Sequence, residues 1–69
     1  MDYRKLKGKI KEVFDTRSAF AKEMKISTTT LSLRLNNKRE WTTDEIVRAC
    51  ELLNIPLTDA HLYFFIAKV

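Results

Sequence analysis

Residues 16–37 read TRSAFAKEMKISTTTLSLRLNN, and this stretch decides the fold of the 69-residue chain. It predicts two short helices, one ending near Met24 and one over about residues 28–36, joined by a tight turn. The two helices can approach closely only where a small side chain stands at their crossing. Ala21 is the small residue at that position. Ser27 follows the turn, where its hydroxyl can cap the second helix.

Apolar contacts between the two predicted helices come from Phe20, Met24 and Ile26. Lys25 occupies the turn, so a residue with a side chain has to take the left-handed backbone conformation there, at some cost in free energy. Two short helices joined by a tight turn, in a small basic chain, are the layout of a helix-turn-helix that reads DNA.

The order of small, apolar and capping positions in residues 16–37 resembles the lambdoid repressor and Cro family of phage regulators, within the bacterial helix-turn-helix transcription factors. The opening DYRKLKGKI, residues 2–10, and the ending YFFIAKV, residues 63–69, are similar to a phage-encoded subgroup. The resemblance covers nearly the whole chain. It implies an all-α fold: a single domain over residues 1–69, formed by a compact bundle of about five short helices around the helix-turn-helix.

Two positions depart from the pattern of that family. Lys25 stands where the family usually has glycine, and Arg34 stands where many relatives carry an apolar residue, with Leu35 taking over the core contact one position later. Arg34 lies on the flank of the second helix, where it can pair with a DNA phosphate or with an acid from the helix that follows. Both alternatives stay open.

The second helix of the pair has a competing interpretation. Residues 28–35, TTTLSLRL, are β-branched at the start and alternate in the way a strand does. From the residues alone, a strand is nearly as consistent as a helix. The family resemblance and the four-residue spacing of Leu31 and Leu35 favour the helix.

A helix over about residues 3–14 precedes the pair. Its single apolar stripe is formed by Leu6, Ile10, Val13 and Phe14. Asp15 or Thr16 caps the helix that ends near Met24. After the pair, Asn37 lies in a polar turn and can take the left-handed conformation that ends a helix.

Thr42 and Glu45 have the spacing of a capping box, which starts a further helix at about Thr43. Its predicted buried face is formed by Ile46, Val47, Cys50 and Leu53. Trp41 directly precedes the box, and two roles suit it: a hydrophobic staple packed on its own helix, or a ring stacked on nucleic acid. The position ahead of the box favours the staple.

The chain ends in an apolar segment. Pro56 breaks the preceding helix, and Thr58 with Asp59 restarts one that ends near Ala67. Residues 62–66 are apolar around most of that helix, which is more than one small core absorbs. Relatives often dimerise through this end, so we predict a dimerisation surface formed by Tyr63, Phe64, Phe65 and Ile66. The alternative is a short extended tail that closes the core.

Charge is distributed unevenly along the chain. Residues 1–39 hold eleven Lys and Arg against four acids, which gives +7, and residues 40–69 hold two against five, which gives −3. A basic half that carries the helix-turn-helix predicts phosphate binding, whereas the acidic half should point away from DNA.

Several classes of site are not expected. With one cysteine, Cys50, and one histidine, His61, the chain offers neither an internal disulfide nor the usual ligand number of a metal site, and we expect no cofactor. Cys50 suits the core, and His61 a helix flank. The chain has no paired nucleophile and base, and Gly8 is its sole glycine, so we do not expect an enzyme.

The predicted base-reading face is the side of the helix over residues 28–36 that lies opposite Leu31 and Leu35. It consists of Thr28, Thr29, Ser32 and Leu33. Hydroxyl groups hydrogen-bond several base edges, and Leu33 suits a thymine methyl unless it packs into the core. Because the face lacks a bidentate Arg or Gln, we expect readout weighted towards methyl contacts and DNA shape.

Contacts to the DNA backbone are predicted from the start of the first helix of the pair and from the polar loop after the second. Arg17 can reach a phosphate where the helix N-terminus adds its dipole. By resemblance, the loop lies along the sugar-phosphate backbone. The predicted set is Arg17, Ser27, Asn36, Lys38, Arg39 and Thr43.

These features lead to two functional hypotheses. The first is a dimeric Cro-type transcriptional regulator that places two recognition helices roughly 34 Å apart on a near-palindromic operator. No signal peptide or membrane span is recognisable, so we expect it in the cytoplasm of a bacterial host, at the nucleoid, and the chain leaves no room for a small-molecule effector domain. The second is a protein-interaction module, antirepressor-like or antitoxin-like, that binds another regulator through its apolar C-terminal end.

Overall fold

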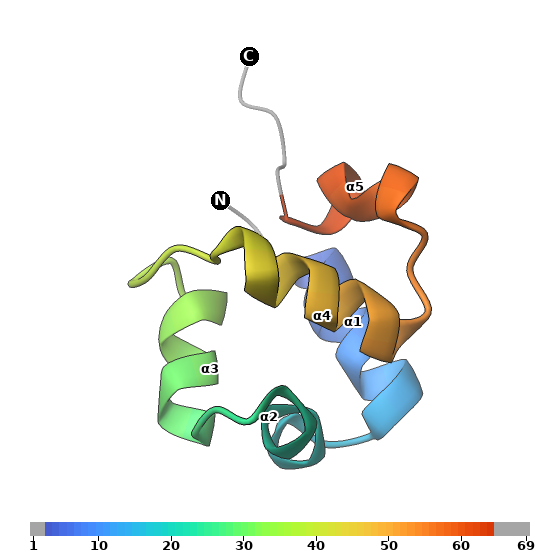
Figure 1. The fold of residues 1–69 in the computed structure, drawn as a ribbon. Helices are drawn as coiled ribbons and strands as arrows, with labels where there is room; N and C mark the ends of the chain where they lie inside the picture. Colours follow the sequence, from blue (N-terminus) through green and yellow to red (C-terminus); the bar gives the residue numbers. More distant parts are fainter. Residues whose placement is uncertain (1–2, 65–69) are drawn as a thin grey trace.

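The computed structural model describes residues 3–64, and within them all regular structure is helical (Figure 1). The predicted all-α fold with about five short helices is therefore confirmed. The elements are α1 (Arg4–Phe14), α2 (Arg17–Met24), α3 (Thr28–Leu35), α4 (Thr43–Leu53), a 3-10 turn η1 (Leu57–Asp59) and α5 (Ala60–Phe64).

The starts of α2, α3 and α4 are set by local side-chain chemistry, as predicted. Thr16, not Asp15, caps α2, where its hydroxyl accepts a hydrogen bond from a backbone N–H at 3.1 Å. Ser27 caps α3 in the same way at 3.0 Å. Thr42 and Glu45 form both hydrogen bonds of the capping box that begins α4. Segment 28–35 is thus a helix, because the cap satisfies its first backbone donors.

Left-handed residues set the path of the chain between helices. Lys25 ends α2 with φ 63° and ψ 38°, as the position of the turn predicts, and its backbone N–H donates to carbonyls of the last turn. Asn37 has φ 62° and turns the loop that leaves α3, and Asn54 ends α4 with φ 58°. Asparagine tolerates this conformation because its short polar side chain can hydrogen-bond to the nearby backbone, whereas the lysine side chain cannot.

The helix α2 packs against three other helices, α1, α3 and α4. Phe20 and Ala21 are almost completely buried, with 0% and 1% exposure. The other side chains of the core come from every α-helix and include Leu6, Ile10, Met24, Leu31, Leu35, Ala49, Cys50, Leu53 and Phe64. The buried sides of α2 and α3 therefore pack against the other helices.

Two predicted core positions are wrong. Val13 and Val47 are each 38% exposed. On α4 the buried positions are Ile46, Ala49, Cys50 and Leu53, whose spacing describes one narrow stripe that excludes Val47. At the end of α1, the half-buried Phe14 packs on Phe20 with ring centroids 5.4 Å apart, which leaves Val13 at the edge of the stripe.

The end of the described chain closes the core. Phe64 is 2% exposed, and its ring packs edge-on against Trp41 with centroids 5.0 Å apart. The prediction that Phe64 lies on a dimerisation surface is therefore wrong, because its apolar area is already used within its own chain. Tyr63 is half-buried beneath the Lys5 ammonium, whereas Phe65, Ile66 and the predicted helix end lie outside the described residues.

The restart after Pro56 also differs from the prediction. A 3-10 turn begins directly at Leu57 and leads into α5, and no side chain caps it. Proline fixes its own φ at a value suited to the residue before a helical turn, so the turn begins without help from the Thr58 hydroxyl.

Replacing Lys25 by glycine tests the cost of the left-handed turn. Glycine takes this conformation without strain, so Lys25→Gly should raise the free energy of unfolding by about 0.5–1 kcal/mol in urea denaturation. The control Lys22→Gly, inside the same helix, should lower it by up to about 1 kcal/mol. A loss of stability in Lys25→Gly would contradict the assignment of strain to this residue.

Candidate DNA-binding site

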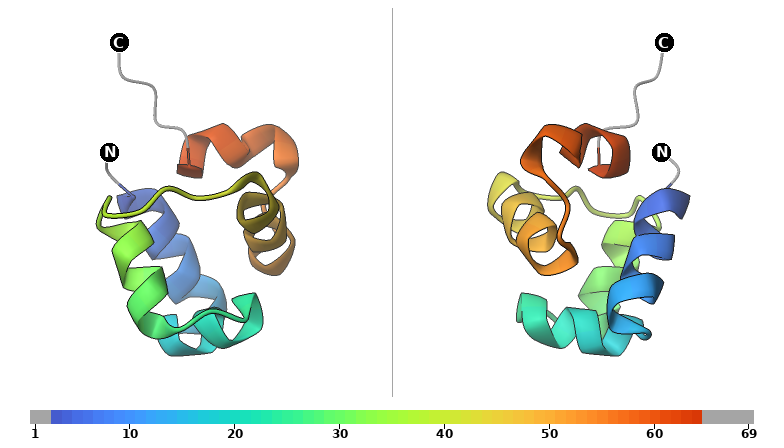
Figure 2. Two further views of the ribbon diagram at one scale, coloured as in Figure 1. Left: turned by 60° about the vertical axis from the view of Figure 1, so that its left-hand side comes forward. Right: turned by 90° about the vertical axis from the view of Figure 1, so that its right-hand side faces the viewer.

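The α2–α3 pair lies at one side of the molecule, away from α5. In Figures 1 and 2, α2 lies at the bottom and α5 at the top, while α3 runs along the edge. The elements packed on α5 are α1, α4 and η1. The outer side of α3 is consequently open to a partner.

The structure brings the four predicted base-reading residues to the accessible part of α3. Thr28 and Thr29 are exposed in its first turn, and Ser32 and Leu33 are half-buried further along. Because Leu33 is half-buried, only part of its side chain is accessible. The resulting face is uncharged and carries hydroxyl and methyl groups.

All six predicted backbone contacts are exposed. Arg17 is the first residue of α2, and Thr43 is the first residue of α4, so both stand at helix N-termini. Asn36, Lys38 and Arg39 are exposed in the loop between α3 and α4. The chain thus places cations and backbone N–H groups on two sides of α3.

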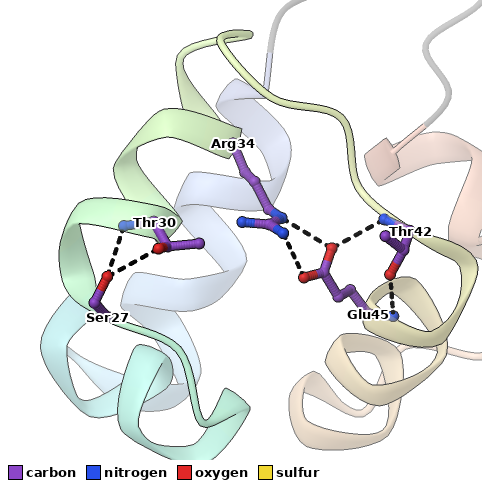
Figure 3. Close-up of polar contacts among 5 residues, drawn as sticks. All are labelled: Ser27, Thr30, Arg34, Thr42 and Glu45. Atoms are coloured by element: carbon purple, nitrogen blue, oxygen red, sulfur yellow. Dashed lines mark hydrogen bonds and ion pairs between the residues drawn. The ribbon is translucent and has the colours of Figure 1, made fainter.

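The sixth residue, Ser27, has a structural use for its hydroxyl. The Ser27 Oγ accepts from the Thr30 N–H and donates to the Thr30 Oγ1 at 2.9 Å (Figure 3). A hydroxyl carries one hydrogen, so in this arrangement none is left for a phosphate. Ser27 acts here as the cap of α3.

Arg34 pairs with an acid of α4, which decides between its two predicted partners. Its Nε donates to Glu45 Oε1 at 2.8 Å, and its Nη2 lies 2.7 Å from Glu45 Oε2 (Figure 3). Both side chains are largely shielded, with exposures of 13% and 18%. Burial alone would raise the pKa of the Glu45 carboxyl, but hydrogen bonds from Thr42 and Arg34 and the Arg34 charge lower it overall.

The basic residues divide into two groups. On α1, Lys9 and Lys11 form exposed ion pairs with Glu12 and Asp15 at 3.4 and 3.3 Å, and Lys5 lies over the Tyr63 ring, 5.5 Å from its centroid. The described residues offer no ion-pair partner to Arg17, Lys38 or Arg39, which flank α3. Two cations of α1 are therefore paired within the chain, while Arg17, Lys38 and Arg39 are free to meet phosphates.

Trp41 lies behind the loop that carries Lys38 and Arg39. Its half-buried ring packs edge-on against Tyr3 as well as Phe64, which favours a packing role over stacking on nucleic acid. Trp41 therefore contacts the residue before α1 and the last residue of α5. An open pocket of about 480 Å³ beside these rings is lined by residues 37–40 and Ile46 too.

The remaining candidate chemistry of the described residues is structural. Cys50 is 1% exposed, and burial raises the pKa of its thiol, so the thiolate that reacts with oxidants is disfavoured. His61 is exposed on α5. Between residues 3 and 64, no three His, Cys, Asp or Glu side chains gather where a metal ion would bind, and no helix has the length and apolar character to cross a membrane.

Comparison with known proteins identifies the family. The family model described as "Protein of unknown function (DUF739)" matches residues 1–67. The chain belongs to this family. No curated protein matches the chain.

A solved structure gives this family a biological context. The chain is similar to the modulator of repression (MOR) of the temperate bacteriophage TP901-1 from Lactococcus lactis, known from its solution structure. The two are 46% identical with a TM-score of 0.84, over 99% of this chain and 92% of that chain. This member of the DUF739 family is thus similar to a regulatory phage protein.

Replacing Glu45 by glutamine tests the ion pair through pH. The folded-state pKa of Glu45 is below its ordinary value of 4.5, so the stabilisation is present above that pH and is lost as pH falls through the folded-state pKa. Glu45→Gln should lower the free energy of unfolding by about 2 kcal/mol at pH 7 in urea denaturation. The difference from the unmodified protein should shrink at an acidic pH below 4.5. Glu12→Gln, in an exposed pair, should change stability by less than about 0.5 kcal/mol at either pH. A Glu45→Gln effect that is independent of pH would contradict this assignment.

Proposed function

We propose that this protein is a regulator of a temperate phage or prophage that modulates repression by binding operator DNA through α2 and α3. The observation that carries the proposal is the accessible, uncharged face of α3 flanked by cations from α2 and from the loop of residues 36–42. A face of this kind fits the major groove, while cations at its edges fit the phosphates on either side.

The contacts divide into two kinds. Hydroxyl groups and the Leu33 methyls on α3 contact base edges, where thymine methyls and the O4, N6 and N7 atoms are available. Arg17, Lys38 and Arg39 contact phosphates, and Asn36 and Thr43 add neutral donors. Because Arg34 is held by Glu45, the face has no guanidinium for guanine, and specificity depends in part on DNA shape.

Occupation of a near-palindromic operator by a homodimer is part of this proposal. The described end of the chain supports a contact between copies, since Leu62 is 42% exposed on α5 and Tyr63 is half-buried beside it. Phe64 takes no part, because it is buried. The protein acts at the nucleoid, in the cytoplasm of a bacterial host, since DNA is its ligand.

A second candidate function is binding to another regulator. The similar phage protein is a modulator of repression, which is a role that a protein can fill by contacting a repressor. Two leucines at the end opposite α2 and α3 are available for such a contact, because Leu57 is 60% and Leu62 42% exposed. In this function the C-terminal end, and not α3, is the working surface.

A double substitution on α3 separates the two functions. Thr29→Ala with Leu33→Ala removes one hydroxyl and one apolar contact from the base-reading face. The ratio of the variant's affinity for the region upstream of its own gene to its affinity for a scrambled duplex should fall at least about tenfold, as measured by fluorescence anisotropy. Leu57→Ala, which lies outside the proposed contact between copies, is the control and should leave this preference unchanged. If only the control weakens binding, and to a protein regulator, the second candidate is the correct one.

A salt titration tests the phosphate contacts. Lys38→Gln should weaken binding to specific and scrambled duplexes alike, and should reduce the slope of log K against log salt by about one. Lys5→Gln removes the same charge near α5 and should leave that slope unchanged. Equal changes in both variants would show that net charge, and not the loop, produces the salt dependence.

A further inference from the structure

We propose that Glu45 is a positioning residue for the DNA-contacting loop of residues 36–42, and that it acts through Arg34 without touching DNA. The loop connects α3 to α4 and carries Lys38 and Arg39. The inference rests on the proposed function, because it concerns how those two cations are presented to phosphates.

One carboxylate holds both ends of this loop. Glu45 Oε1 accepts from Arg34 Nε at 2.8 Å and from the Thr42 backbone N–H at 2.9 Å, while Oε2 pairs with Arg34 Nη2 at 2.7 Å (Figure 3). Arg34 belongs to the last turn of α3, and Thr42 is the last residue before α4. The distance between the two helices across the loop is thereby set by a single side chain.

The start of the loop follows the last turn of α3. The Lys38 N–H donates to the Leu33 carbonyl at 2.8 Å, and the Asn37 N–H donates to the Arg34 carbonyl at 3.3 Å. A rotation of the end of α3 therefore carries Lys38 with it. The same rotation would turn Leu33 on the base-reading face, so the pair links the phosphate contacts to the base contacts.

Loss of the Glu45 charge would change the position of Arg34. The Arg34 Nη1 atom is buried and makes no hydrogen bond, so Glu45 supplies the side-chain anchoring of this guanidinium. A shielded cation without a counter-charge is costly, and the side chain gains free energy by moving to water. The end of α3 would then lose its connection to α4.

Glu45→Gln separates this link from the capping box. Glutamine can still accept the Thr42 hydrogen bond, as it does in capping boxes generally, but it has no charge to hold Arg34. Glu12→Gln is the matched control for the same chemical change in an exposed pair. Ile10→Val, in the core of α1, is the control for a general loss of stability.

The first measurement is amide hydrogen exchange of the full chain without DNA. In Glu45→Gln, the Lys38 and Asn37 amides should exchange about tenfold faster relative to the α1 amides. In the unmodified protein, local opening at these amides has to break the ion pair of Arg34 with Glu45, and in the variant this cost is absent. Ile10→Val should speed only the amides that exchange by global unfolding. Proportional changes at all amides in Glu45→Gln would overturn the proposal.

The second measurement is binding to a duplex of the upstream region of its own gene, under conditions where every variant is folded. Glu45→Gln should bind about tenfold more weakly with a salt slope reduced by about one, and adding Lys38→Gln should cause no further change in the slope. An unchanged slope together with unchanged exchange overturns the inference and leaves the proposed function standing. If the unmodified protein binds no DNA, the proposed function fails, and hydrogen exchange still decides whether Glu45 positions the loop.

Discussion

The packing of α2 against its neighbours depends on the burial of Ala21 beside Phe20. A larger side chain at Ala21 would separate α2 from the elements around it, and the fully buried Phe20 ring fixes α2 against the bundle. The turn at Lys25 then has to be tight enough to bring α3 alongside, which explains why a lysine adopts a left-handed conformation there. The orientation of α3 follows from these two constraints.

The basic residues in and around α3 differ in whether they are paired within the chain. Arg34 is the basic residue of α3, and it is neutralised by Glu45 within the chain. The cations that flank α3 are exposed and belong to its neighbours, at Arg17, Lys38 and Arg39. In the proposed function, electrostatic attraction to DNA acts at the edges of the face, and hydroxyl and methyl groups at its centre read methyl positions and groove shape.

The features that the sequence predicts well depend on residues close together in the chain. The caps at Ser27 and Thr42 act on backbone groups three residues away, so spacing alone reveals them. Two other features depend on contacts between separate elements, about which local periodicity contains no information. They are the burial of Phe64 against Trp41 and the ion pair of Arg34 with Glu45. The accessible part of α3 could be predicted because it follows directly from the positions of its two buried leucines, Leu31 and Leu35.

The most direct test of the central claim is a heteronuclear NMR titration of the full chain with the duplex from upstream of its own gene. If α3 and the loop after it form the DNA-binding surface, amide shifts should concentrate at residues 28–39 and at the N-terminus of α2, and should diminish as salt is added. Shifts confined to α5 and η1, or no shifts at all, would contradict the account.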